Sequence, residues 1–141
     1  MAAYQAQNKK VSSCKCGPDY IDPMFHKEVL GVDSKNLDLF FSSEDELRKE
    51  YAKHAADAEL VITEGVMGYY DGMRLDSVTA SSYDVARTLD IPAVLILPCK
   101  GAALSLCAVV SGIVSFQKDS NIQGIILNRV SKMLYPRLKK M

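Results

Sequence analysis

The sequence carries no excess of charge of either sign. Its 141 residues include 17 Lys and Arg and 17 Asp and Glu, so the formal net charge at pH 7 is zero. Proteins that bind nucleic acid usually show a basic face or a high isoelectric point, because they must neutralise phosphates. The basic stretch 132–140 is too short to change this balance. We therefore expect no nucleic-acid partner.

Long apolar runs are also missing. The longest mainly apolar run, 102–116, is interrupted by serines and is shorter than the roughly 20 residues that span a bilayer. The N-terminus lacks the basic head, apolar segment and cleavage site of a secretory signal. These absences predict a cytoplasmic protein without a membrane partner.

The few cysteines form no CxxC pair. They are Cys14, Cys16, Cys99 and Cys107, and in a reducing compartment disulfides between them would be uncommon. Cys14 and Cys16 are two residues apart in a strand-like run, so their side chains should share one face. That spacing could suit a metal, but neither histidine has ligand-like spacing to a cysteine, so a structural pair is favoured.

The sequence does contain an alternation of short apolar runs and helical patterns. Four runs predict strands, at 11–16, 60–63, 93–97 and 124–128. Helices are predicted after Ser43 through Ala55, at 76–89, at 101–116 and at 131–140, where Pro136 must lie in the first turn or kink the helix. Apolar strands that alternate with helices are typical of a mostly parallel sheet covered on both faces. The length fits a single α/β domain.

Polar and glycine-rich segments follow each predicted strand. They are GPDYIDP at 17–23, TEGVMGYYDG at 63–72, PCKGAALS at 98–105 and NRVSK at 128–132. In parallel sheets, ligands bind beyond the carboxyl ends of the strands. The sequence therefore predicts a functional site at this edge of the sheet.

Two of these segments carry pairs of carboxylates. Glu64 and Asp71 stand among glycines that let a backbone approach a ligand, and a carboxylate at a strand end suits Mg²⁺ with substrate phosphates. Asp19 and Asp22 stand between two prolines, which predict a stiff loop. Each segment also has a plainer interpretation, as solvated loop acids or as a turn whose aspartates bond local amides.

Two ring-bearing side chains accompany Asp19 and Asp22. Tyr20, which lies between them, is either a substrate contact or a half-buried ring. His26 follows shortly after and is more often a helix-start or core histidine than a proton carrier. The residues alone leave both alternatives open.

Taken together and in chain order, the segments resemble one family. KCGPDYIDPMFH (15–26), NLDLFF (36–41), VITEGVMGYYDG (61–72), TASSYDVARTLDIPAVLILPCKGAALS (79–105) and GIILNRVS (124–131) are similar to the cobyrinic acid a,c-diamide synthases. That family consists of ATP-dependent amidoligases of cobalamin biosynthesis. Cobyric acid synthase, dethiobiotin synthetase and the partition ATPases are similar in fold, but they do not combine GPDYIDP with EGVMGYYDG.

The resemblance implies a P-loop-NTPase-like fold and a two-part reaction. A glutaminase domain releases ammonia, and a synthetase domain uses Mg²⁺ and ATP to phosphorylate a carboxylate side chain of a corrinoid, which ammonia then attacks. By the family's pattern, Asp19 and Glu64 match acids near the metal and the phosphates. Asp22 and Asp71 match catalytic acids linked to the substrate, and Tyr20 falls in the substrate loop.

Further matches concern the nucleotide, and here the chain also departs from the family. Asn128 matches a position associated with adenine recognition, and Lys100, Thr79 and Ser105 match the pattern as well. The family opens with a phosphate-binding loop of the form GxxxxGK[ST] and continues into a glutaminase domain, and neither occurs here. The segment 1–10 resembles the end of the helix that follows that loop.

We therefore expect 1–141 to be a partial ATP-binding synthetase domain, truncated at its N-terminus, without the glutaminase domain. Without the loop and its lysine, it should bind ATP weakly and be inactive by itself. An unpaired sheet edge would then favour homo-oligomers. The alternative is a non-catalytic binding or interaction module of the same fold, but such a module would not need four acids in matching positions.

Overall fold

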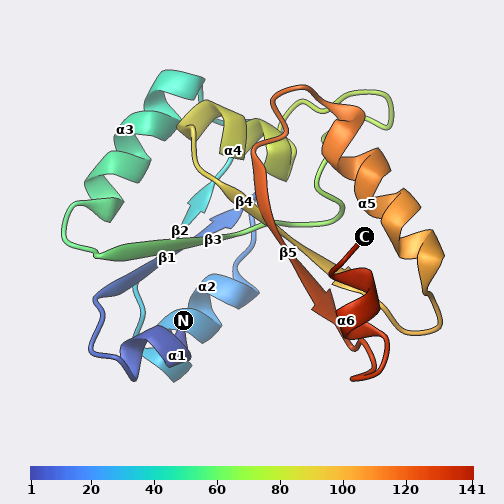
Figure 1. The fold of residues 1–141 in the computed structure, drawn as a ribbon. Helices are drawn as coiled ribbons and strands as arrows, with labels where there is room; N and C mark the ends of the chain where they lie inside the picture. Colours follow the sequence, from blue (N-terminus) through green and yellow to red (C-terminus); the bar gives the residue numbers. More distant parts are fainter. The chain divides into compact units, whose positions relative to one another are not determined.

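The computed structural model describes all residues from 1 to 141 and divides into two compact units, Met1–Leu89 and Asp90–Met141. Figure 1 shows their elements. The first unit contains α1 (Ala2–Gln5), β1 (Val11–Cys16), α2 (Ile21–Leu30), β2 (Ser34–Leu37), α3 (Glu44–Ala55), β3 (Leu60–Glu64) and α4 (Ser82–Leu89). The second contains β4 (Ala93–Pro98), α5 (Leu104–Phe116), β5 (Ile122–Asn128) and α6 (Tyr135–Leu138). Both units are α/β with parallel strands, as predicted.

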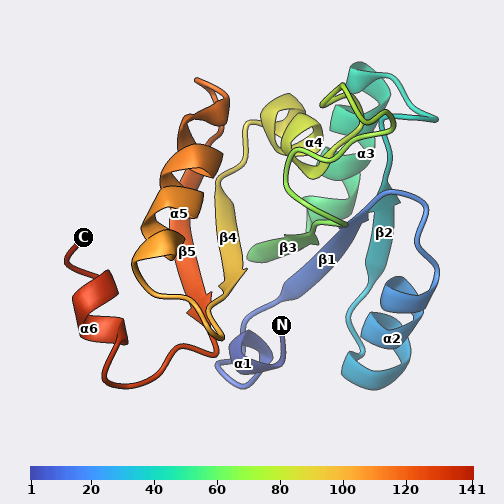
Figure 2. The ribbon, with the colours of Figure 1, turned by 90° about the vertical axis from the view of Figure 1, so that its right-hand side faces the viewer.

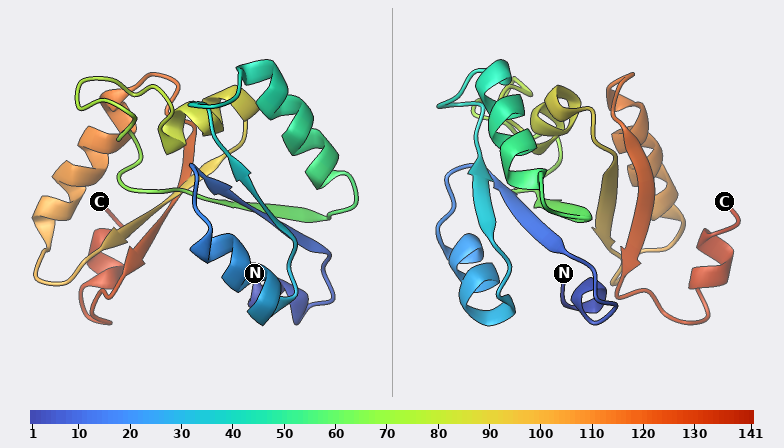
Figure 3. Two further views of the ribbon diagram at one scale, coloured as in Figure 1. Left: turned by 180° about the vertical axis from the view of Figure 1, so that it is seen from behind. Right: turned by 90° about the vertical axis from the view of Figure 1, so that its left-hand side faces the viewer.

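The first unit is built on a three-stranded parallel sheet in the order β2-β1-β3. Connections between parallel strands are right-handed. The chain leaves β1 in one direction to reach β2 and returns across β1 to reach β3, so the two crossover helices must lie on opposite faces. Figure 1 and the rear view of Figure 3 show α2 and α3 on opposite sides of this sheet.

The face of β1 towards α3 is the apolar core. Cys14 and Cys16 are buried there together with Leu37, Leu47 and Val85. Side chains two residues apart on a strand share a face, so the predicted common face of the two cysteines is confirmed. Both thiols are free.

The face of β1 towards α2 is polar although it is equally buried. Ser13 is 0% exposed and Lys15 is 5% exposed. The Ser13 hydroxyl lies 3.1 Å from Nδ1 of His26, a buried residue of α2. Polar side chains are buried only at a cost unless they are hydrogen-bonded, and this face satisfies them by pairing.

Helix α3 begins where the sequence predicts. Its Ser43 and Glu46 form a capping box, in which Glu46 Oε2 accepts from the Ser43 amide at 2.9 Å and the Ser43 hydroxyl accepts from the Glu46 amide at 3.4 Å. Such a box satisfies amides that the first turn of a helix leaves unpaired. Acids in this first turn also suit the positive end of the helix dipole.

Helix α4 begins later than predicted, at Ser82 instead of residue 76. Ala80 has a φ of 60°, a left-handed conformation that a helix cannot include. The Ser81 hydroxyl accepts from the Asp84 amide at 3.1 Å, and the Asp84 carboxylate accepts from the Ala80 amide at 2.9 Å. These reciprocal bonds make Ser81 the effective start signal.

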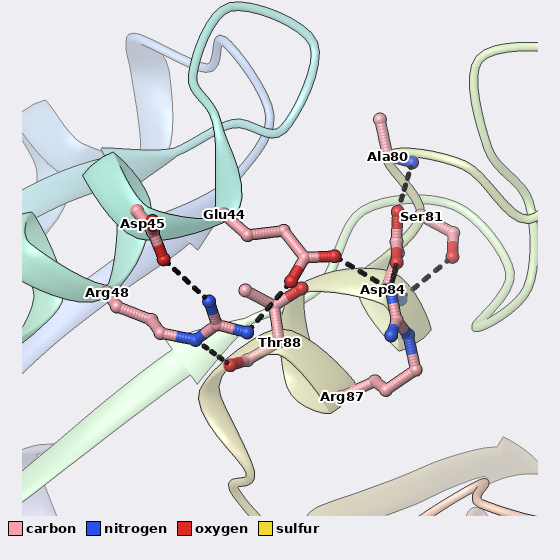
Figure 4. Close-up of polar contacts among 8 residues, drawn as sticks. All are labelled: Glu44, Asp45, Arg48, Ala80, Ser81, Asp84, Arg87 and Thr88. Carbon is pink, nitrogen blue, oxygen red and sulfur yellow. Dashed lines mark hydrogen bonds and ion pairs between the residues drawn. The ribbon is translucent and has the colours of Figure 1, made fainter.

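A polar network joins α3 to α4, as Figure 4 shows. Glu44 lies 2.8 Å from Arg48 and 3.2 Å from Arg87, and Arg87 also contacts Asp84 at 2.7 Å. Arg48 donates to the Thr88 carbonyl at 3.0 Å. Single exposed ion pairs contribute little, but here one carboxylate is shared by two helices and fixes α4 against α3.

Neither α2 nor β2 was predicted from the sequence. Strand β2 is short and polar, with Leu37 as its buried residue. Helix α2 contains Pro23 in its first turn, where the missing amide costs no helical bond. The prediction that Asp22 lies on a loop was therefore wrong, because this residue belongs to the first turn of α2. Gly31, with a φ of 62°, ends the helix.

The second unit pairs β4 with β5, with Pro98 opposite Asn128. Its two predicted strands are confirmed. Figure 2 shows α5 running alongside the strand pair. The helix predicted at 131–140 is reduced to the single turn α6, with Pro136 in its first turn as expected. None of the helices combines the length and apolar character needed to cross a membrane.

Candidate active site at the carboxyl ends of β1 and β3

A buried lysine lies at the centre of the candidate site. Nζ of Lys15 is 2.6 Å from Asp22 Oδ2, 3.3 Å from Glu64 Oε1 and 3.7 Å from Asp19 Oδ2. It also donates to the Gly65 carbonyl at 3.3 Å. Three of the four predicted acids therefore converge on one cation.

The register of the sheet brings these groups together. Lys15 pairs with Glu64 on the adjacent parallel strand, so β1 and β3 end at the same edge. Directly beyond β1, Gly17 adopts a φ of 78°, which lets the chain turn towards α2. The predicted meeting of the two acidic segments at one sheet edge is confirmed.

Asp19 serves the turn and faces the cluster at the same time. Its Oδ1 accepts from the amides of Ile21 at 2.8 Å and Asp22 at 3.3 Å, so the aspartate turn considered as the plainer interpretation is present. Its Oδ2 faces Lys15. Desolvation raises the pKa of Asp19, but the two amide bonds and the charge of Lys15 outweigh it and hold this pKa below its usual value.

Lys15 is charged despite its burial. Burial lowers the pKa of its ammonium group, but the hydrogen bonds that it donates to Asp22 and Glu64 and the negative charges of these residues more than compensate, so the pKa lies above its usual value. One positive charge thus faces the carboxylates of Asp19, Asp22 and Glu64. The cluster as a whole is negative.

His26 lies beside this cluster. Its Nδ1 is 3.1 Å from the Ser13 hydroxyl and 3.4 Å from the Ser34 hydroxyl, as a satisfied core histidine requires. Its Nε2 is 3.6 Å from Glu64 Oε2. The two oxygens of Glu64 therefore face two different partners, Lys15 and His26.

Asp71 bonds within its own loop. Its Oδ2 accepts from the Gly68 amide at 2.9 Å. A Cβ at Gly68 would collide with this carboxylate, so a larger residue there would force the Asp71 side chain to move. Tyr20, directly before α2, is 75% exposed, so the ring is open to solvent instead of half buried. The functional roles of Asp71 and Tyr20 stay predictions.

The other predicted residues belong to other elements of the chain. Thr79 is exposed, and its hydroxyl lies 2.8 Å from that of Ser77 in the turn before α4. In the second unit, the Asn128 carbonyl accepts from the Cys99 amide at 2.8 Å, and Lys100 is exposed just beyond β4. Their proposed contacts with a nucleotide stay predictions.

Lys15 was not predicted as a residue of the site, although the sequence contains a signal for it. The residue stands in the short strand VSSCKC, directly before the turn GPD. Lysine is almost never fully buried unless it is paired. A lysine in a central strand therefore indicates carboxylates nearby, and Asp19 and Asp22 were the nearest candidates.

A cavity of about 750 Å³ lies at the other end of the sheet. Its lining includes Lys10, Ser12, Asp33 and His54 and none of the predicted acids. His54 is satisfied there, because its Nε2 lies 2.7 Å from the Ser12 hydroxyl. The candidate site is thus an open sheet edge, where parallel sheets bind their ligands, and not this cavity.

Parallel sheets flanked by helices, with acids at a carboxyl edge, define an α/β protein, and this arrangement is consistent with a truncated P-loop-like fold. No protein-family profile matches the chain. The chain is 40% identical to the cobyrinate a,c-diamide synthase of Synechococcus sp. and 41% identical to that of Clostridium acetobutylicum, each over 99% of its length. The chain is therefore homologous to the cobyrinate a,c-diamide synthases, and the resemblance seen in its motifs is confirmed.

The relatives are much longer than this chain. It spans 31% of the length of the Synechococcus protein, and the same share of the Clostridium tetani protein, to which it is 40% identical. The names of these relatives describe what the whole proteins make. What the matching segment contributes must be argued from its own residues.

Proposed function

We propose that this chain supplies the carboxylate-bearing part of the synthetase site of a cobyrinate a,c-diamide synthase. The observation that carries the proposal is the convergence of Asp19, Asp22 and Glu64 at one edge of a parallel sheet, in a chain 40% identical to such enzymes. The reaction is the ATP-dependent amidation of corrinoid carboxylates in cobalamin biosynthesis, with ammonia derived from glutamine. We place it in the cytoplasm.

The donor set of the site fits Mg²⁺. Oδ2 of Asp19 and Oε1 of Glu64 are hard oxygen donors that lie 3.7 and 3.3 Å from the same Lys15 Nζ, so they face one region. No group of three or more His, Cys, Asp and Glu side chains could hold a metal by itself. With nucleotides, Mg²⁺ needs only one or two carboxylates, because phosphates and water complete its coordination.

Asp19 and Glu64 would hold the ion. When bound, Mg²⁺ would offset negative charge on the phosphate oxygens during phosphoryl transfer. Asp19 is suited to this role because its lowered pKa keeps it ionised and its amide bonds keep it in place. Glu64 is suited because both of its oxygens are already oriented.

The proposed reaction has two steps. A carboxylate oxygen of the corrinoid attacks the γ-phosphorus of ATP, the bond to the β-phosphate bridging oxygen breaks, and ADP leaves. Ammonia then attacks the acyl carbon, inorganic phosphate leaves, and the nitrogen loses a proton as the amide forms. Positioning and electrostatic stabilisation are the main contributions a protein can make to such a transfer.

We assign Asp22 and Tyr20 to the substrate. Asp22 lies in the first turn of α2, two residues after the exposed Tyr20, and its carboxylate can accept the proton that the attacking ammonia loses. Asp71 is assigned to turnover on the family pattern. Asn128, with Lys100 near it at the ends of the paired strands β4 and β5, is assigned to the nucleotide on the same basis.

A segment exchange tests the proposal. This chain would replace the matching segment of the Synechococcus relative, and the hybrid would be assayed for amidation of cobyrinic acid with Mg²⁺, ATP and ammonia. We expect activity in the hybrid, none in the isolated chain, and a loss of about 100-fold on Glu64→Gln. Glu59→Gln is the matched control, because Glu59 pairs with Lys9 near the opposite end of β3.

Two outcomes would overturn the proposal. A folded hybrid without amidation activity would favour the non-catalytic module. Full activity of the hybrid that carries Glu64→Gln would remove the assignment of the acidic cluster. The predicted homo-oligomer is a separate proposal, which sedimentation of the isolated chain would test.

A further inference from the structure

We propose that Lys15 is a positioning residue, which joins the segment after β1 to the segment after β3 and holds the carboxylates of Asp22 and Glu64 in the orientation that a ligand meets. The catalytic role of these two carboxylates rests on the proposed function. The contact that Lys15 makes between the two segments is a property of the chain itself, so it can be tested without an activity assay.

The hydrogen-bonding capacity of Lys15 is matched by its surroundings. Its side chain is only 6% exposed, so water satisfies little of it. A lysine ammonium has three N–H donors, and three acceptors lie within 3.3 Å of Nζ, namely Asp22 Oδ2, Glu64 Oε1 and the Gly65 carbonyl. With all three donors engaged, the side chain has one favoured orientation.

The acceptors come from two separate parts of the chain. Asp22 belongs to α2, whereas Glu64 ends β3 and Gly65 begins the glycine-rich loop. The side chain of Glu64 is 45% exposed, and a side chain so exposed at a strand end would otherwise change rotamer freely. Lys15 and His26 hold its two oxygens from the protein side.

The position of Lys15 is not explained by stability. It lies on the polar face of β1, outside the cluster of Cys14, Cys16, Leu47 and their neighbours that forms the core. Burying a charge costs desolvation, and apolar replacements of buried ion pairs are often neutral or stabilising. The carboxylate partners of Lys15 keep access to water, since Asp22 is 38% exposed. Water can therefore solvate them when the lysine is removed.

Amide hydrogen exchange of the full chain tests whether Lys15 joins the segments that follow β1 and β3. Lys15→Met keeps the length of the side chain and removes its charge, and Lys15→Arg keeps the charge. Lys35→Met is the control, because Lys35 on the adjacent strand β2 pairs with Glu50 at 3.5 Å, away from the acidic segments. Exchange would be followed at the amide of Asp22, bonded to Asp19, and at the amide of Val66, bonded to Ser82.

We expect Lys15→Met to speed exchange about tenfold at both amides, the factor that one lost hydrogen bond produces, while the urea midpoint stays unchanged. Lys15→Arg should restore most of the protection, and Lys35→Met should change neither amide. Unchanged exchange at either amide would overturn the proposal. Faster exchange throughout the chain with a lower urea midpoint would also overturn it, since it indicates a purely structural lysine.

The hybrid enzyme supplies the second measurement. Lys15→Met should lower kcat about tenfold with little change in KM for ATP, and Lys15→Arg should recover most of kcat. If Lys15→Met speeds exchange at the two amides but leaves kcat unchanged, Lys15 does not position the carboxylates for catalysis. An inactive hybrid would defeat the proposed function, and the exchange measurement would still decide whether Lys15 joins the two segments.

Discussion

The two faces of β1 differ although the same six residues form both. Towards α3, Cys14 and Cys16 pack with Leu47 in an apolar core. Towards α2, Ser13 and Lys15 are just as buried but are paired with polar groups. Because side chains alternate along a strand, one central strand can anchor the fold on one face and orient the candidate site on the other.

The two faces should therefore respond differently to amino-acid substitutions. Apolar packing is lost in proportion to the volume removed. A charged cluster open to water on one side loses geometry before it loses stability. Substitutions on the core face should therefore unfold the chain, and substitutions on the polar face should impair function in a folded chain.

The largest effect on stability is expected for Leu47→Ala. This side chain is 1% exposed in the core, so its truncation should lower the free energy of unfolding by about 2–5 kcal/mol. Urea denaturation followed by circular dichroism would measure the loss. Leu75→Ala is the control, because Leu75 is fully exposed and its truncation should cost nearly nothing. A loss below about 1 kcal/mol for Leu47→Ala would place the core elsewhere.

The next effect concerns the thiols of the core face at alkaline pH. Burial raises the pKa of Cys14 to about 12 and that of Cys16 to about 11. The folded chain keeps these protons where the unfolded chain loses them, so their stabilising contribution is complete below about pH 9 and is lost as the pH rises to about 12. The loss is at most about 1.4 kcal/mol per pH unit and thiol.

Urea unfolding of the chain and of Cys14→Ala between pH 8 and 11 would measure this dependence. We expect the midpoint of the unsubstituted chain to fall more steeply above pH 9 than that of the variant. Leu75→Ala provides the control, because it removes an exposed side chain and no thiol and should leave the slope unchanged. Equal slopes for the unsubstituted chain and Cys14→Ala would show that this thiol is not protected by burial.

A smaller effect on stability, with a large effect on activity, is expected for Asp22→Asn on the polar face. Asp22 is 38% exposed, so its contact with Lys15 should contribute less than about 1 kcal/mol to stability. In the hybrid enzyme, loss of the proton acceptor should lower turnover about 100-fold. The two measurements together separate function from folding, and a parallel loss of both would contradict the distinction between the faces.

The smallest effect on stability is expected for Asp71→Asn. This exposed acid accepts one hydrogen bond, from the Gly68 amide, and an amide oxygen can replace that acceptor. Stability should change by less than about 0.5 kcal/mol, whereas turnover of the hybrid should fall. Thermal melting and the amidation assay would measure both, and a large drop in melting temperature would make Asp71 a residue of the turn alone.

The sequence predicted those parts of the fold that depend on local signals. The apolar runs of β1, β3, β4 and β5 and the capping box at Ser43 can be recognised within a few residues. It missed β2 because SKNL has neither an alternating apolar pattern nor a β-branched residue. It misread the prolines around Asp22 as a loop because Pro23 is compatible with the first turn of a helix.

The candidate site was predicted in composition but not in geometry. Asp19, Asp22 and Glu64 were recognised as acids following strands. Lys15, which they share, was overlooked because lysines in a sequence are usually solvated and because its partners are not all nearby in the chain. Asp71 was grouped with the other acids, whereas its carboxylate bonds the Gly68 amide in its own turn.

By itself the sequence determined the α/β class, the order of most elements, the family resemblance and which loops carry carboxylates, since apolar periodicity, caps and motifs are properties of neighbouring residues. Only the tertiary structure decided that Lys15 donates to Gly65, 50 residues away, and that Glu64 lies between Lys15 and His26. Parallel pairing of β1 with β3 creates that neighbourhood, and α2 completes it. The charge of the buried Lys15 then holds together Asp22 and Glu64, which are far apart in the sequence.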